Sequence, residues 1–201
     1  MIAVDVETFG VEPHLNSIYS VGAIDLDNLS RPFFYEECRA SEGTHIEQES
    51  LDFLGLTSKV AIDPKKQTEG ELVHKFIAWA LEASDRTFAG QNVSFDRDFL
   101  RYAAQRAGHT DWPFAHRTID SHSLAWMHMV KRGVTPPVDP EKKRSALDLD
   151  AILVYCGIPE EPTPHNALTG AKSHAEVISR LLYDKKLLPE FESFSIPWQK
   201  E

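Results

Sequence analysis

Two acidic residues, Asp5 and Glu7, stand two positions apart within an otherwise apolar and β-branched stretch, MIAVDVETF. Side chains at positions i and i+2 of a strand project from the same face, so a strand here would aim both carboxylates in one direction. Two like charges on a buried strand are costly unless cations neutralise them. Carboxylate oxygens suit Mg²⁺ or Mn²⁺. The pair therefore indicates a metal site, and the alternative is an edge strand with one solvated face.

Two further residues carry groups that could complete such a site. Asp96 is expected in the first turn of a helix, just past a short strand that ends near Gly90. Acidic residues favour that turn because they stabilise the helix N-terminus, and taken alone Asp96 fits this role better than metal binding. His165 lies at the start of the last long helix. Its imidazole could act as a general base near neutral pH, or it could be structural or exposed.

Hydrophobic periodicity predicts the elements that must position these residues. Alternating apolar residues indicate three early strands, close enough to form an antiparallel meander, at 1–9, 16–27 and 32–36. Helical spacing and short apolar runs then indicate helices at 69–84, 95–107, 145–156 and 165–183, and a further helix through Leu124, Ala125 and Met129. Short strands are expected at 87–90 and 117–119. Ser94 is the expected N-cap of the second helix. We expect residues 43–66 to be irregular with a short helix, and residues 133–144, with three prolines, to be a loop. This order indicates an α/β layered domain with a mixed sheet.

Length and composition restrict the class of protein. The 201 residues fit one domain, and 42% apolar with 26% charged residues is typical of a globular protein. No apolar run reaches the roughly 18 residues of a membrane span. No signal peptide is predicted, and Cys38 and Cys156 make no metal or redox spacing, so a cytoplasmic location and buried thiols are expected. The net charge of −10 argues against a protein that coats duplex nucleic acid, but not against an enzyme that grips a chain end.

Three motifs occur in an order and spacing that resemble the DEDDh exonucleases. This DnaQ-like group includes ribonuclease T, oligoribonuclease and polymerase proofreading domains. The first motif, D-x-E-T-x-G, occupies residues 5–10. The second consists of Asn92, a Phe-Asp pair at 95–96 and a Phe-Leu pair at 99–100. The third, His-x-Ala-Leu, occupies residues 165–168. The resemblance covers roughly residues 1–188, the expected exonuclease domain. It implies an α/β, ribonuclease H-like mixed five-stranded sheet with antiparallel first three strands, flanked by helices. Residues 189–201 are then a tail packed on the domain or on a partner.

The resemblance also implies a mechanism and a set of site residues. Asp5, Glu7 and Asp96 would hold two divalent metals, Mg²⁺ or Mn²⁺, and His165 would take the proton from the attacking water. The reaction would release nucleoside 5′-monophosphates from single-stranded RNA or DNA 3′ ends. Substrate contacts are expected from Thr8, Phe9, Leu56, Asn92 and Phe95. Core packing is the favoured alternative for Phe95. The basic residues that flank the proline-rich loop (Lys131, Arg132, Lys142, Lys143 and Arg144) could receive the substrate backbone or be simply solvated.

The family pattern breaks at Gly170. A fourth acid is expected five residues after the histidine, and counting from His165 gives Gly170. Glycine offers no ligand and is less favourable than Ala in a helix interior by roughly 0.5–1 kcal/mol. His174, one turn further along the same face, is a candidate substitute ligand that would favour Mn²⁺ or another transition metal. The favoured alternative for His174 is an exposed helix residue, and Lys172 and Glu176 are also close in sequence.

Gly170 leaves three explanations open. The chain is a divergent but active enzyme, a protein that binds without cutting, or a variant inactivated by substitution. We favour an active or weakened nuclease, because a pure binder has no use for His165. The main alternative is a non-catalytic exonuclease-fold protein that binds nucleic-acid ends or a protein partner. No G-x-S-x-G, P-loop or zinc-site spacing indicates another hydrolase. No membrane partner is expected, and a homodimer is as compatible with the sequence as a monomer.

Overall fold

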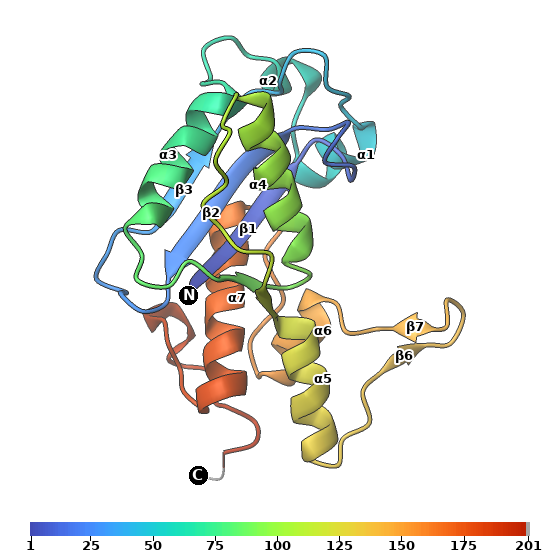
Figure 1. Ribbon diagram of the computed structural model, residues 1–201. Coiled ribbons are helices and arrows are strands. Elements are labelled where there is room, and N and C mark those ends of the chain that lie inside the picture. Colours follow the sequence, from blue (N-terminus) through green and yellow to red (C-terminus); the bar gives the residue numbers. More distant parts are fainter. Residues whose placement is uncertain (200–201) are drawn as a thin grey trace.

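A mixed five-stranded sheet forms the centre of the computed structural model, which describes residues 1–199 (Figure 1). The strands are β1 (Ile2–Thr8), β2 (Ile18–Asp25), β3 (Phe34–Glu37), β4 (Phe88–Gly90) and β5 (Thr118–Asp120), in the order β3-β2-β1-β4-β5. The first three strands pair antiparallel, whereas β4 pairs parallel with both β1 and β5. This topology confirms the predicted fold class.

Helices cover both faces of the sheet. They are α1 (Gln48–Leu54), α2 (Ser58–Ala61), α3 (Glu69–Leu81), α4 (Ser94–Arg106), α5 (Ser121–Lys131), α6 (Leu149–Tyr155) and α7 (Ala167–Tyr183), followed by the 3₁₀ turn η1 (Pro189–Phe191). Helices α3 and α4 lie side by side over one face, while α7 crosses the other and contacts β1, β2 and α5 (Figure 1).

The two faces of β1 explain where its acidic residues point. Ile2, Val4 and Val6 belong to the apolar core shared with α3 and α4. Ala3 packs instead with Ala171 and its neighbours on α7. Because side chains alternate along a strand, the odd-numbered Asp5 and Glu7 share the face of Ala3. The prediction that both carboxylates share one face is therefore confirmed, and that face is the one covered by α7.

Two local features fix α7 close against the sheet. Asn166 caps its N-terminus, because its side-chain oxygen accepts hydrogen bonds from the backbone N–H groups of Leu168 and Thr169. The Asn166 amide also donates to the Tyr35 hydroxyl on β3, at 2.8 Å. On β2, a Cβ at Gly22 would lie only 2.1 Å from the Ala167 carbonyl oxygen. Only glycine permits this approach, which sets the distance from α7 to Asp5, the partner of Gly22 in the sheet register.

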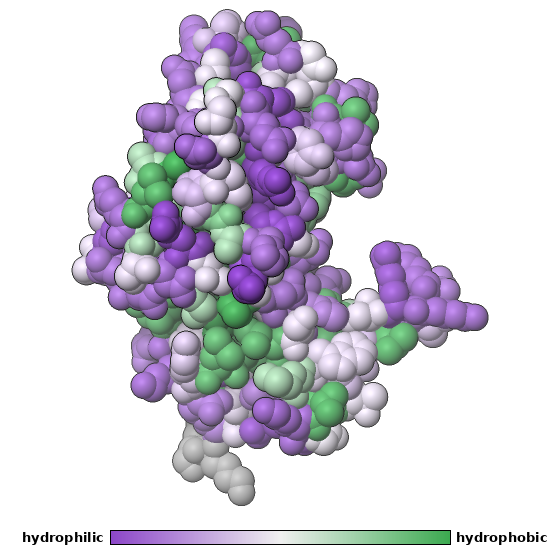
Figure 2. Space-filling view, viewed as in Figure 1, coloured by the Kyte–Doolittle hydropathy of each residue, from purple (hydrophilic) through white to green (hydrophobic). Residues whose placement is uncertain are grey.

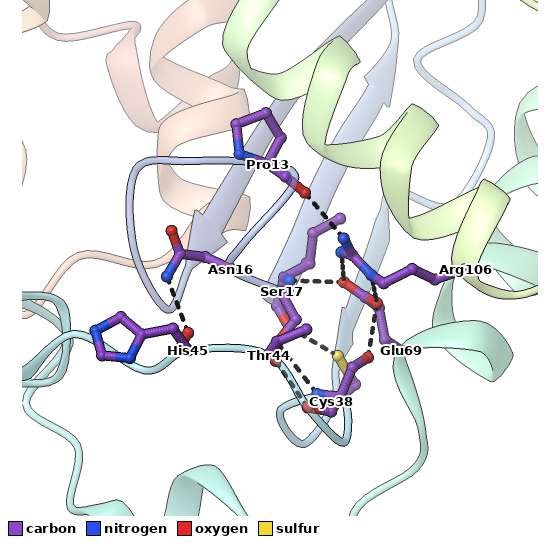
Figure 3. Close-up of polar contacts among 10 residues, drawn as sticks. Pro13, Asn16, Ser17, Cys38, Thr44, His45, Glu69 and Arg106 are labelled. Atoms are coloured by element: carbon purple, nitrogen blue, oxygen red, sulfur yellow. Dashed lines mark hydrogen bonds and ion pairs between the residues drawn. The ribbon is translucent and has the colours of Figure 1, made fainter.

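A buried carboxylate holds together the segments at the upper end of the sheet (Figure 3). Glu69 is 2% exposed and accepts hydrogen bonds from the Ile18 backbone N–H and the Ser41 hydroxyl. It also pairs in bidentate fashion with Arg106 of α4, which in turn donates to the Pro13 carbonyl oxygen. Glu69 therefore connects α3, α4, β2 and the loop that follows β1.

The segment after α7 packs back onto the domain through Arg180. This side chain is fully buried, pairs with Glu176 at 2.7 Å, and donates to four carbonyl groups. One belongs to Cys156 and the others to the C-terminal segment, at Phe191, Phe194 and Ser195. Trp198 lies beyond them and stacks on Tyr155 of α6.

Three local predictions were wrong. Residues 133–144 do not form a simple loop, because Val138–Asp139 (β6) and Arg144–Ser145 (β7) pair as a short hairpin that projects from the domain (Figure 1). Helix α6 begins at Leu149 rather than 145, since the Asp148 side chain caps it. Ser94 is the first residue of α4 and not its cap.

The two cysteines are buried as expected. None of the helices in residues 1–199 has the length and apolar character needed to cross a membrane.

Candidate active site

Acidic side chains from two elements meet beyond the end of β4. Strand β4 pairs with β1 only at Ile2 and Ala3, so the Val6 backbone N–H has no ladder partner there. It donates instead to Asp96 Oδ1 at 2.9 Å. Asp96 is 4% exposed in the first turn of α4. A residue that would stabilise a helix N-terminus in solvent is thus held inside the fold, next to Asp5 and Glu7.

Burial and like charges dominate the electrostatics of this cluster. Burial, with the charges of Asp5, Glu161 and Asp96, raises the pKa of Glu7 from 4.5 to about 9. Burial and the charge of Asp5 likewise raise the pKa of Asp96 well above its ordinary value. The charge of Asp5 therefore makes ionisation of Glu7 and Asp96 harder, and a bound cation would relieve this repulsion.

His174 faces this cluster from α7. Its Nε2 lies 3.3 Å from Asp5 Oδ1, and the ring is 2% exposed, so the expectation of an exposed helix residue was wrong. Burial by itself lowers an imidazole pKa, but the contact with Asp5 and the charges of Asp96 and Glu161 outweigh it and raise the pKa of His174. His174, the candidate substitute ligand, therefore lies at the site and forms an ion pair with Asp5.

Gly170 of α7 lies directly against Asp5. A Cβ at this position would lie 2.4 Å from Asp5 Oδ2 and 2.6 Å from its Cγ. The Asp5 carboxylate therefore fills the space that a side chain at residue 170 would need. The position of Asp5, turned toward His174, is therefore compatible with glycine at residue 170 but not with a larger side chain there.

His165 lies on the loop just before α7, with its ring 22% exposed. Its Nδ1 is 3.4 Å from Glu161 Oε2. The ring stacks on Phe53 of α1, with the ring centroids 4.2 Å apart and the planes 20° from parallel. Neither Glu161 nor Phe53 was predicted from the sequence. The family motif begins at His165, and nothing in the spacing of the preceding loop marks Glu161.

A cleft of about 390 Å³ opens beside the cluster. Its lining includes Glu7, Thr8, Phe53 and Phe95, so two aromatic rings border the same space as a carboxylate. Phe95 is half-buried and packs on Phe99, so it belongs to the core edge as well as to the cleft.

The other predicted substrate contacts, Phe9, Leu56 and Asn92, do not line this cleft. The Phe9 ring is completely buried against Tyr19, so only the Phe9 backbone could reach a substrate. Leu56 is partly buried and packs against the apolar cluster that contains Phe9 and Tyr19. Asn92 is exposed at a positive φ of 48° in the turn before α4, and its carbonyl accepts from the Phe95 N–H.

The donor set agrees in chemistry with a divalent metal. Asp5, Glu7, Asp96 and Glu161 present carboxylate oxygens, which hard divalent cations prefer. Within residues 1–199, no group of three His, Cys, Asp or Glu side chains is already gathered as a ligand set. Two buried polar atoms, Glu161 Oε1 and His174 Nδ1, have no hydrogen-bond partner in that part of the chain. An unpaired carboxylate oxygen close to other acidic side chains is a feature that a cation would satisfy.

Fold and site together define a nuclease-type domain, in which carboxylates on a central strand and on a neighbouring helix face a histidine. The chain belongs to the RNase T family of exonucleases, whose family model matches residues 2–178. It is therefore a member of the DEDDh, DnaQ-like exonuclease family. No curated protein sequence matches it.

Solved structures of exonuclease I share the fold. The E. coli exonuclease I complex with a dA16 oligonucleotide has a TM-score of 0.69 and 17% identity, over 92% of this chain and 40% of that one. A product-bound exonuclease I structure has a TM-score of 0.69 and 15% identity, over 92% of this chain and 43% of that one. A zinc-bound complex of the E. coli enzyme with single-stranded DNA matches equally well, with a TM-score of 0.69 and 15% identity, over 92% and 41% of the two chains. The present chain thus spans about two fifths of these proteins.

Proposed function

We propose that this protein is a metal-dependent 3′→5′ exonuclease that removes nucleoside 5′-monophosphates from single-stranded nucleic acid. One observation carries the proposal: Asp5, Glu7 and Asp96 converge beside an aromatic-lined cleft, and burial with mutual repulsion raises the pKa of Glu7 to about 9. Such a cluster is costly to the fold unless cations balance it. The exonuclease I relatives that share the fold are bound to single-stranded oligonucleotides, which supports a strand end as the substrate.

Asp5, Glu7 and Asp96 are the residues that would hold Mg²⁺ or Mn²⁺. When bound, such ions lower the pKa of a water and neutralise the charge that develops on the phosphate and the leaving oxygen. His165 accepts the proton of the attacking water at its free Nε2, because its Nδ1 faces Glu161. Phe53 holds the imidazole plane by stacking. Phe53 and Phe95 also offer ring surfaces in the cleft on which a terminal base could stack, a contact that tolerates any base.

The proposal is tested with 5′-labelled single-stranded RNA and DNA oligonucleotides in Mg²⁺, in Mn²⁺ and in chelator. We expect a ladder of products shortened from the 3′ end, which needs metal and disappears in both Asp5→Ala and His165→Ala. Asp98→Ala is the matched control, because Asp98 lies on the same helix as Asp96 but is 43% exposed and pairs with Arg97. A ladder that survives Asp5→Ala would contradict the proposal.

The second candidate is a protein that binds strand ends without cutting them. The observation that favours it is the contact between Asp5 and His174, because a metal ligand turned toward an imidazole is not free for a cation. This candidate predicts retention of labelled oligonucleotides by the wild-type protein with no shortening in either metal. Cleavage by Gly170→Asp alone would assign the chain as a disabled member of the family.

A further inference from the structure

The site has a carboxylate fewer than its family pattern, so the question is which residue of this chain takes that place. Two candidates close to Gly170 in sequence are already engaged elsewhere. Lys172 pairs with Glu190 at 2.8 Å. Glu176 is completely buried, pairs with Arg180 and accepts from the backbone N–H groups of Leu187 and Leu188. Neither side chain faces the acidic cluster.

His174 faces the cluster but is poorly placed to replace a carboxylate. Its Nε2 is directed at Asp5 Oδ1, at 3.3 Å. The two nitrogens of an imidazole ring point in different directions, so Nδ1 is directed away from the Asp5 carboxylate. A cation bound at His174 Nδ1 would therefore lie too far from the Asp5 carboxylate to be held by both side chains. The contact through Nε2 neutralises the charge of Asp5 and adds no negative ligand to the site.

Glu161 lies on the loop between α6 and α7. Its side chain is only 9% exposed, although its neighbour Glu160 lies on the surface. Oε2 lies 3.4 Å from His165 Nδ1, whereas Oε1 is buried and has no hydrogen-bond partner in residues 1–199. Its charge also contributes to the raised pKa of Glu7, so the two carboxylates interact electrostatically.

A buried carboxylate oxygen without a partner is expensive for the fold unless something binds it. Glu161 has one oxygen beside the histidine expected to act as base and a second, buried oxygen that is left without a partner. This arrangement places a carboxylate next to His165 from the loop before α7, in place of one from inside the helix.

We infer that Glu161 supplies the fourth acidic metal ligand of this site, with Oε1 on the cation and Oε2 on His165. The inference rests on the proposed metal-dependent function and makes the substitution by Gly170 compatible with it. An acid at 161 in place of one at 170 conserves the charge of the site, while the ligand moves from α7 to a loop.

The test is calorimetric titration of the purified protein with Mn²⁺ alone, without nucleic acid. Glu161→Gln keeps the size of the side chain but removes its charge and one acceptor oxygen, and Glu160→Gln is the matched control one residue away. We expect Glu161→Gln to weaken Mn²⁺ binding by roughly tenfold or more. Glu160→Gln should leave it unchanged, and Asp5→Asn should abolish it. Circular dichroism and melting in chelator verify that each variant is folded.

The outcomes separate this inference from the proposed function. If Asp5→Asn abolishes Mn²⁺ binding while Glu161→Gln binds as the wild type does, Glu161 is not a ligand but the proposed function stands. An unchanged affinity together with a shifted pH profile of cleavage would also overturn the inference, and would make Glu161 a positioning residue for His165. If the wild-type protein does not bind Mn²⁺ at all, both the inference and the metal-dependent function fail.

Discussion

At the scale of single residues, the close approach of Asp5 to position 170 makes a prediction about stability. Gly→Ala in a helix interior ordinarily stabilises by about 1 kcal/mol. Here the new Cβ would lie 2.4 Å from Asp5 Oδ2, so the carboxylate must turn and give up its hydrogen bond with His174. We therefore expect Gly170→Ala to leave the free energy of unfolding unchanged or lower it, measured by urea denaturation in chelator.

A double-mutant cycle supplies the control for this prediction. Asp5→Ala removes the atoms that the new Cβ would meet, so in that background Gly170→Ala should recover the ordinary gain of about 1 kcal/mol. A coupling free energy near zero between the two positions would show that Asp5 does not fill this space in solution.

Individual site residues were only partly predictable from the sequence. Asp5 and Glu7 could be assigned to one face because strand geometry has a strict period of two. Asp96 and His165 needed the family motifs, since an acid in a first helical turn has a common structural explanation. Glu161 left no signal, because it lies on an irregular loop and its burial depends on how that loop folds over His165. The burial of His174 depends on the close approach of α7 to the sheet, which no pattern on α7 itself encodes.

At the scale of elements, α7 is held at both ends by polar contacts, and its C-terminal contact can be tested. Arg180→Met would leave the buried Glu176 without its cation and remove the donor to four carbonyl groups. We expect a decrease of roughly 3–5 kcal/mol in the free energy of unfolding, because a lone buried charge is far costlier than a broken surface pair.

Lys75→Met is the matched control for Arg180→Met. Lys75 pairs with Glu36 on the surface, with side chains 51% and 34% exposed, and its replacement should cost less than about 1 kcal/mol. Equal decreases for the two variants, measured by urea denaturation, would mean that Arg180 does not act as a buried pair that joins α7 to the C-terminal segment.

Helices whose apolar residues recur at helical spacing could be predicted from the sequence. The short hairpin, which is defined only by the pairing of its two strands, could not. Helices α3, α4 and α7 begin within about two residues of their expected positions, since each buries a regular apolar face. The β6–β7 hairpin was missed because its strands contain two residues each and bury little. Its prolines favour a loop, which is correct for the residues around the two strands but not for the pairing itself.

At the scale of the whole molecule, the raised carboxyl pKa values predict that the metal-free protein loses stability as the pH rises. The pKa of Glu7 is 4.5 when unperturbed and about 9 when folded, so the folded state retains a proton that the unfolded state releases. For such a group, stability is complete below the unfolded pKa and is lost as the pH rises toward the folded pKa. His174, whose pKa is also raised, acts in the same direction.

We therefore expect the free energy of unfolding in chelator to fall between about pH 5 and pH 9, by roughly 1 kcal/mol per pH unit for each proton involved. Glu7→Gln should flatten this slope, because the amide does not titrate, and saturating Mn²⁺ should flatten it in the wild-type protein. Glu160→Gln is again the control. A stability that rises over this pH range would show that the carboxylates at the site are not mutually destabilising.

The net charge of the protein limits how strongly it can bind a nucleic-acid strand through phosphate contacts. A protein with a net charge of −10 cannot bind nucleic acid through a broad basic surface. Three consecutive exposed cations, Lys142, Lys143 and Arg144, lie on the β6–β7 hairpin, whose hydrophilic end projects beyond a hollow in the surface (Figure 2). Few phosphates can therefore be neutralised. The logarithm of the association constant for a single-stranded oligonucleotide should fall with the logarithm of salt concentration with a slope of roughly −2 or shallower.

The hairpin accounts for part of that slope if a strand passes the hollow on its way to the cleft. Replacing Lys142, Lys143 and Arg144 by serine should then make the slope shallower by about 0.7 for each phosphate that is no longer neutralised. Serine at Glu141 is the control, because it changes the same turn without removing a cation. Fluorescence anisotropy with a labelled oligonucleotide in chelator measures both quantities without cleavage. An unchanged slope in the triple variant would assign the hairpin to solvent, and would confine recognition to the cleft beside Glu7, where stacking rather than charge must then hold the strand end.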